Sequence, residues 1–117
     1  MTHLFNHKPT AELQELDAAH HMHPFTNGAQ LAEKGTRVIT RAQGCTLTDS
    51  DGVEILDAMA GLWCVNIGYG RDELARAAFE QMQELPYYNT FFQTSHPPVI
   101  ELAQRIAALA PGDLNHV

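Results

Sequence analysis

The chain has 117 residues, the length of one small domain, and its 44% hydrophobic and 18% charged residues are typical of a folded protein. Its net charge of −7, with few and unclustered Lys and Arg residues, argues against nucleic-acid partners and against anionic membrane surfaces. No apolar run reaches bilayer length, and the first residues show no signal-peptide apolar core. Because Cys45 and Cys64 show no CxxC spacing and no disulfide framework, a reduced, cytoplasmic setting is the simplest interpretation.

The N-terminal part of the chain predicts a helix followed by a loop. Thr10 is expected to cap this helix, because a threonine hydroxyl can accept a bond from a free backbone N–H of the first turn. Three histidines, His20, His21 and His23, lie at the C-terminal end, where cationic side chains suit the helix dipole. Pro24 is expected to close the helix, because proline cannot continue it.

The His-His-x-His spacing at this helix end also resembles a metal site. Zinc, however, prefers three or four ligands on a braced framework, and the sequence indicates no fourth ligand. No metal is therefore expected. A small metal-binding domain built on His20, His21 and His23 stays open as a less favoured alternative.

The middle of the chain, from about residue 37 to residue 56, predicts a three-stranded antiparallel meander. A β-rich run around Val38 and Ile39 is broken by Gly44, after which the β-rich pattern resumes. The segment Asp49–Gly52 carries the Asp-Gly pair that favours a tight hairpin turn, and a third strand follows. A sheet of this size is only marginally stable alone, so its apolar face needs a helix or another sheet packed over it.

A glycine-bent loop, Leu56–Arg71, joins this meander to the next helix. Glycines at 61, 68 and 70 permit backbone angles that other residues resist, and Trp63 lies between them. Aromatic residues on such loops are a common way to build the wall of a small-molecule pocket. From the residues alone, the interpretation of Trp63 as a core residue at a strand–helix junction is nevertheless favoured over a pocket wall.

The last part of the chain predicts two helices. Asp72–Leu85 has acidic residues at its start and helical apolar periodicity, and Pro86 ends it. The second helix opens at Ser95 or His96, with prolines in its first turn, and continues to Leu109.

Aromatic residues crowd the connection between these helices: Tyr87, Tyr88, Phe91 and Phe92. Such density is unusual for a solvent-exposed loop. The segment is either a buried connector or a contact surface for a partner or ligand, because aromatics are enriched in interface cores.

The sequence holds no complete active site. Lys8 lies in a polar tail and Lys34 in a predicted loop, so neither has the surroundings of an activated nucleophile. The carboxylates of Asp49, Asp51 and Asp57 are better explained by turns. From the residues alone, the chain predicts an α+β fragment with a candidate aromatic pocket wall.

About the last hundred residues closely resemble the N-terminal part of class III aminotransferases, and within them the ω-amino-acid group of β-alanine–pyruvate type. The matching segments are residues 20–26, 35–39, 49–52, 56–71, 84–92 and 109–115. The Gly-Leu-Trp-Cys sequence around Trp63 and the Tyr-Tyr-Asn-Thr-Phe-Phe sequence ending at Phe92 point to the narrower group.

The resemblance implies a two-domain, fold type I enzyme that depends on pyridoxal 5′-phosphate (PLP) and works as a dimer with sites at the interface. Such an enzyme would move an amino group from an amine or ω-amino acid, such as β-alanine, to pyruvate. Phe25, Leu62 and Trp63 match family positions that line the substrate pocket, which reverses the interpretation of Trp63 as core. Phe91 and Phe92 match an aromatic pair near the active site across the dimer interface.

The resemblance also implies three parts of the chain. Residues 1–34 would form an N-terminal arm and helix, and residues 35–70 the meander and pocket loop of the small domain. Residues 71–117 would form helices and an aromatic connector leading into a large PLP-binding domain.

The family's catalytic and cofactor-binding residues are expected to lie beyond this chain. Its phosphate cradle, Schiff-base lysine and carboxylate-binding arginine have no counterpart here, so the 117 residues alone are expected to be an inactive N-terminal fragment. The alternative is a non-catalytic, truncated interaction module that binds a full-length aminotransferase subunit.

Overall fold

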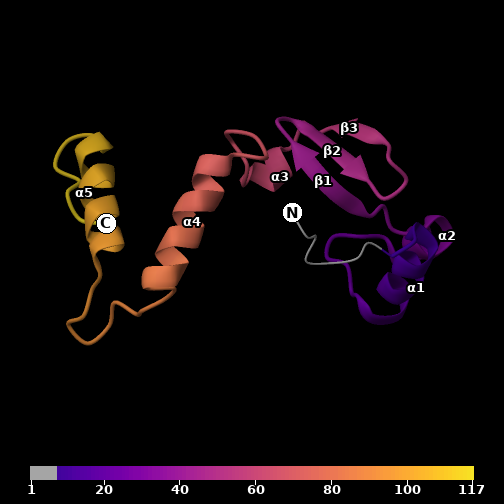
Figure 1. The fold of residues 1–117 in the computed structure, drawn as a ribbon, viewed down its shortest axis with the longest axis horizontal. Coiled ribbons are helices and arrows are strands. Elements are labelled where there is room, and N and C mark those ends of the chain that lie inside the picture. Colours follow the sequence, from indigo (N-terminus) through magenta and orange to yellow (C-terminus); the bar gives the residue numbers. More distant parts are fainter. Residues whose placement is uncertain (1–7) are drawn as a thin grey trace. The chain divides into compact units, whose positions relative to one another are not determined.

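The computed structural model describes residues 8–117, and contacts within the chain divide it into two compact units, with the boundary in the sequence between Arg71 and Asp72. The first unit contains, in chain order, α1 (Thr10–His20), α2 (Gly28–Lys34), β1 (Ile39–Gln43), β2 (Thr46–Asp49), β3 (Glu54–Leu56) and α3 (Ala60–Trp63) (Figure 1). The second contains α4 (Asp72–Glu84) and α5 (Pro97–Leu109). No helix within the described part of the chain has both the length and the apolar character to cross a membrane.

The predicted meander is confirmed. The three strands are antiparallel in the order β1-β2-β3, with Arg41 opposite Thr48 and Leu47 opposite Ile55. The turn from β2 to β3 depends on Asp49, whose side chain accepts hydrogen bonds from the backbone N–H groups of Asp51 (3.1 Å) and Val53 (2.8 Å). Asp49, at 7% exposure, is the only buried residue of those described. The most buried point of the described chain is therefore a hydrogen-bonded polar turn and not a cluster of packed apolar side chains.

Two predictions for α1 are wrong. Thr10 is the first helical residue rather than the cap, which is Pro9, and its hydroxyl lies 2.8 Å from both the Ser50 hydroxyl and the Asp51 carboxylate. The helix ends at His20 rather than at Pro24, because the backbone of His21 is already extended. The side chain of Thr10 therefore connects the helix to the β2–β3 turn.

A second short helix, α2, corrects the assignment of Lys34 to a loop. Asn27 caps it, since its side-chain oxygen accepts from the N–H groups of Ala29 (3.0 Å) and Gln30 (3.2 Å). Lys34 is its last residue, and Gly35 follows with a φ of 71°.

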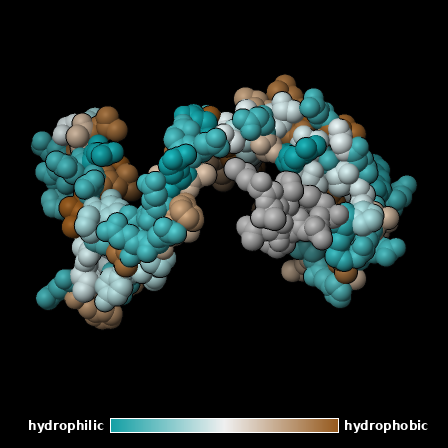
Figure 2. All heavy atoms as spheres, in the orientation of Figure 1, coloured by the Kyte–Doolittle hydropathy of each residue, from teal (hydrophilic) through white to brown (hydrophobic). Residues whose placement is uncertain are grey.

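The two predicted C-terminal helices are confirmed. Pro86 follows α4, which ends one residue earlier than expected, at Glu84, while His96 precedes α5 and prolines occupy its first turn. No hydrophobic residue among residues 8–117 is buried. Figure 2 accordingly shows hydrophobic residues, in brown, at the surface of both units. The apolar residues of these elements are therefore at most half-buried within the described chain.

Candidate functional site

The glycine-bent loop after β3 is organised by the side chain of Asp57. One carboxylate oxygen accepts from the N–H of Met59 (2.9 Å), and the other accepts from the N–H of Gly61 (2.8 Å) and the hydroxyl of Tyr69 (2.7 Å). Asp57 thus ties the beginning of the loop to a residue near its end. We call this set of contacts the Asp57 clasp.

The end of the loop is fixed to the sheet. Tyr69 and Gly44 exchange two backbone hydrogen bonds, of 2.8 and 3.1 Å, next to the turn between β1 and β2. A Cβ atom added at Gly68, where φ is 86°, would lie 3.1 Å from the carbonyl oxygen of Gly44. Gly61, with a φ of 60°, is constrained in the same way, because its Cβ would lie 2.8 Å from the Tyr69 hydroxyl. Glycine at both positions therefore permits the close approach that the clasp needs.

Hydrogen bonding sets the charges in the clasp. The pKa of Asp57 is lowered by the Tyr69 hydroxyl and, to a smaller extent, by the backbone N–H groups of Met59 and Gly61. The same contact raises the pKa of Tyr69, because a deprotonated phenol beside the carboxylate would be repelled. At neutral pH the pair is therefore a protonated phenol donating to a carboxylate, which is the stronger, charge-assisted type of hydrogen bond.

The clasp holds Leu62 and Trp63 in a backbone conformation that side chains rarely adopt. Their φ angles are 63° and 68°, and α3, to which they belong, is not a regular helix. Such left-handed residues cost about 1–3 kcal/mol each and persist where the surroundings fix them. The Trp63 side chain is 81% exposed, so within this chain it is not a core residue. The loop presents a large aromatic face outward.

The aromatic connector contains a second strained aromatic position. Phe92 has a φ of 57° and is 92% exposed, and its ring meets that of Phe91 edge to face, with centroids 6.3 Å apart. The turn is held by Asn89, whose side chain accepts from the N–H of Phe91 (2.9 Å), and by Thr94, whose hydroxyl donates to the carbonyl of Phe91 (2.6 Å).

Phe25, the remaining predicted site residue, follows Pro24 in the segment between α1 and α2. Its φ is 50° and its side chain is fully exposed. Four of the five predicted site residues therefore combine positive φ with exposure: Phe25, Leu62, Trp63 and Phe92. Strain of this kind clusters at ligand clamps and active sites.

The predicted site residues form local groups. Leu62 and Trp63 lie on one loop of the first unit, and Phe91 and Phe92 on one connector of the second. Sequence reasoning missed the roles of Asp57 and Tyr69 in positioning the first pair. The signal was present in Gly61 and Gly68, since a side chain at Gly61 would meet the Tyr69 hydroxyl and one at Gly68 would meet the backbone of Gly44.

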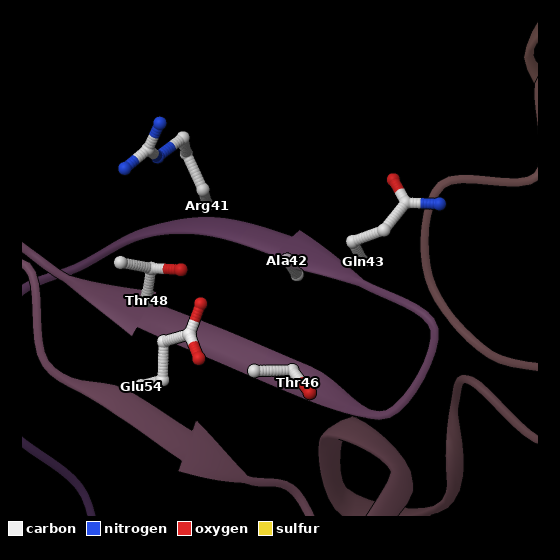
Figure 3. A pocket seen from close by; sticks show the side chains of 6 residues that line it. All are labelled: Arg41, Ala42, Gln43, Thr46, Thr48 and Glu54. Carbon is white, nitrogen blue, oxygen red and sulfur yellow. The ribbon is translucent and has the colours of Figure 1, made fainter.

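A polar hollow lies on the sheet, apart from the predicted residues. It is lined by Arg41, Ala42, Gln43, Thr46, Thr48 and Glu54 (Figure 3). It is open and has no aromatic wall, whereas small-molecule sites are mostly enclosed and apolar. The strained aromatic residues are therefore the better candidate.

The described residues do not fit a covalent PLP site. Such a site needs a lysine whose amine is partly deprotonated, through burial or a neighbouring cation. Lys8 instead forms an ion pair with the carboxylate of Glu12, and Lys34 is exposed at the end of α2. Neither lysine therefore has the surroundings that such an attachment point needs.

The chain is similar to two aminotransferases of known name. The chain is 62% identical over 108 residues to the putrescine–pyruvate aminotransferase of Pseudomonas aeruginosa, covering 92% of this chain and 24% of that protein. It is 39% identical over 103 residues to the β-alanine–pyruvate aminotransferase of the same organism, covering 88% of this chain and 22% of the relative.

A solved structure agrees with these relatives. The (S)-enantioselective ω-transaminase from Thermomicrobium roseum superposes with a TM-score of 0.91 at 49% identity, over 96% of this chain and 25% of that one. The chain thus spans about a quarter of the length of the relatives it matches. Residues 29–117 also match the family model described as aminotransferase class-III. The chain belongs to the class III aminotransferase family.

Proposed function

We propose that this chain is the N-terminal part of an ω-transaminase that moves an amino group from a primary amine or ω-amino acid to pyruvate. Class III aminotransferases of the ω-transaminase type depend on PLP, which supplies the amino-transfer chemistry when bound. Pyruvate appears in the names of both relatives from P. aeruginosa, which supports it as the acceptor. The greater identity to the putrescine enzyme supports a donor with a primary amine at the end of an alkyl chain.

The outward, strained presentation of Leu62 and Trp63 is the observation that carries this proposal. An exposed indole on a fixed loop can bind the alkyl part of an amine and limit its size. Phe25 would complete the same wall. The role of these residues is to position the donor and exclude water, while the reacting groups come from outside this chain.

We further propose that Phe91 and Phe92 lie at a homodimer interface and approach the active site of the partner subunit. The support is the exposure of a whole aromatic segment, since Tyr87 and Tyr88 are also exposed. Contiguous exposed aromatic surface is typical of interfaces.

The experiment uses the complete protein that carries these residues, supplied with PLP. Putrescine and β-alanine are each offered as donor with either pyruvate or 2-oxoglutarate as acceptor, and the amino acid formed is measured. We expect alanine from pyruvate, with putrescine the better donor. Glutamate formed only from 2-oxoglutarate would contradict the proposed acceptor.

The alternative of a non-catalytic module is not favoured, because the family match runs through residues 29–117. The same experiment separates the two. A complete protein that forms no amino acid from any pair, yet binds another aminotransferase subunit, would support the module.

A further inference from the structure

Two histidines and an aspartate converge at the C-terminal end of α1. Asp17 and His21 are four residues apart, and His23 lies just beyond the helix. The Nδ1 atom of His21 is 2.9 Å from one carboxylate oxygen of Asp17, and the Nε2 atom of His23 is 2.8 Å from the other. One potential ligand atom from each residue lies within 4.8 Å of the other two.

The local backbone brings these side chains together. Residues four apart on a helix lie on the same face, which places Asp17 beside His21. The helix then ends, because the backbone of His21 is extended. His23 precedes Pro24, and a residue before proline is restricted to extended conformations, so its range of positions is narrow before any ligand binds.

The cluster is partly enclosed. The side chains of Asp17 and His23 are 17% and 20% exposed, while that of His21 is 60% exposed. The two imidazole rings pack at a tilt, with centroids 4.2 Å apart. Two of the three residues are therefore held by their surroundings, and the third leaves an open side from which an ion can enter.

We propose that Asp17, His21 and His23 bind a divalent transition-metal ion of the zinc type. Two imidazole nitrogens and one carboxylate oxygen are a ligand set that zinc uses, and water can complete the tetrahedron. Asp17 takes the place that a histidine-only interpretation gives to His20. His20 lies on the same helix but outside the cluster.

Metal binding requires both imidazoles in the neutral tautomer whose proton lies on the nitrogen away from Asp17. The two ring nitrogens that now share hydrogens with Asp17 must present lone pairs to a metal, so each ring carries its proton on the other nitrogen. Two neutral imidazoles and one carboxylate leave the occupied site with a single positive charge. The ion would join the end of α1 to the segment that leads into Phe25, and so fix the direction of that segment. The binding itself does not depend on the proposed transaminase function.

The test is calorimetric titration of Zn²⁺ into the complete protein that carries these residues, after chelation and dialysis. We expect binding that weakens at least tenfold in Asp17→Asn and in His23→Gln. His20→Gln is the matched control, because it removes a neighbouring histidine outside the cluster, and its affinity should be unchanged. Equal loss in His20→Gln, or no loss in His23→Gln, would overturn the proposal.

A second experiment is needed because these substitutions could weaken metal binding by disturbing the fold. It uses a variant that gains an absorption band when the metal binds. His21→Cys keeps a ligand at the open side, and with Co²⁺ it should give a thiolate-to-cobalt absorption band that the unsubstituted protein lacks. The same cysteine in Asp17→Asn/His23→Gln should lose that band. A band of equal strength in both cysteine variants, or none in either, would show that the three residues do not act together.

Discussion

The two strained aromatic segments of this chain are held in different ways. The Trp63 loop is tied by Asp57 to Tyr69, twelve residues away, and by Tyr69 to the sheet at Gly44. The Phe91–Phe92 turn is held by Asn89 and Thr94, through contacts spanning no more than five residues. The first loop is therefore tied to the small sheet, whereas the second is held by the local contacts of Asn89 and Thr94.

The largest expected effect comes from placing a charge in the second segment. In the complete protein, Phe91→Asp would bury a carboxylate without a partner at the proposed interface, at a cost of about 3–5 kcal/mol in dimer stability. Sedimentation velocity should show dissociation, with activity lost in parallel. Gln93→Asp adds the same charge two residues away at a position that is already polar, and should stay dimeric. A Phe91→Asp variant that is dimeric and fully active would mean that the segment is only a local connector.

The second-largest expected effect is a loss of folding stability when the Asp57 clasp is disturbed. Gly61→Ala adds a Cβ that displaces the Tyr69 hydroxyl from Asp57 and strains a positive φ, so we expect about 2–3 kcal/mol of lost stability by chemical denaturation. Gly52→Ala is the control, because Gly52 also has a positive φ, of 83°, but open space around it. It should cost only about 1 kcal/mol. Equal losses in the two variants would show that the Tyr69 contact does not hold the loop.

Acid should loosen the clasp. The folded pKa of Asp57 lies below its unfolded value, so its stabilising effect is complete above the unfolded pKa, which is about 4. That effect is lost as the pH falls through the folded pKa. Hydrogen exchange of the Met59 and Gly61 amides, corrected for intrinsic rates, should show protection that declines in this range. Asp57→Asn should lose protection at all pH values, whereas Asp113→Asn should behave as the parent protein; protection unchanged by Asp57→Asn would contradict the account.

The smallest expected effect is a change in folding stability when backbone strain is relieved at Gln93, next to the Phe91–Phe92 turn. Gln93 has a φ of 63°, so Gln93→Gly should relieve strain and raise stability by up to about 1 kcal/mol. The control, Gln104→Gly, places the same residue inside α5 and should lower stability by about 1 kcal/mol. Thermal denaturation of both variants measures the difference, and a loss in both would argue against strain at Gln93.

Local patterns were sufficient to predict the sheet and the last two helices. The Asp51-Gly52 turn, the acidic start of α4 and the prolines opening α5 act over a few residues, and all lie where they were expected. The short helix α2 was missed because Gly28 is a poor helix former, although Asn27 is a good cap.

The positioning contacts could not be predicted in this way. Asp57 was explained as a turn residue, and its bond to Tyr69 becomes visible only when the loop closes on Gly44. Likewise, the His-His-x-His spacing gives no indication that Asp17 meets His21 and His23 in space. The predicted three-part domain division stays a prediction.

The most direct test of the central claim, that Trp63 forms a substrate wall, is the relative kcat/KM of the complete protein for a bulky and a small amine. Trp63→Ala should shift this ratio toward the bulky amine by about 10–200-fold, the range for a change of pocket contacts worth about 1–3 kcal/mol. Val53→Ala, at the exposed β2–β3 hairpin, should leave the ratio unchanged. A ratio in Trp63→Ala equal to that of the parent protein would contradict the account.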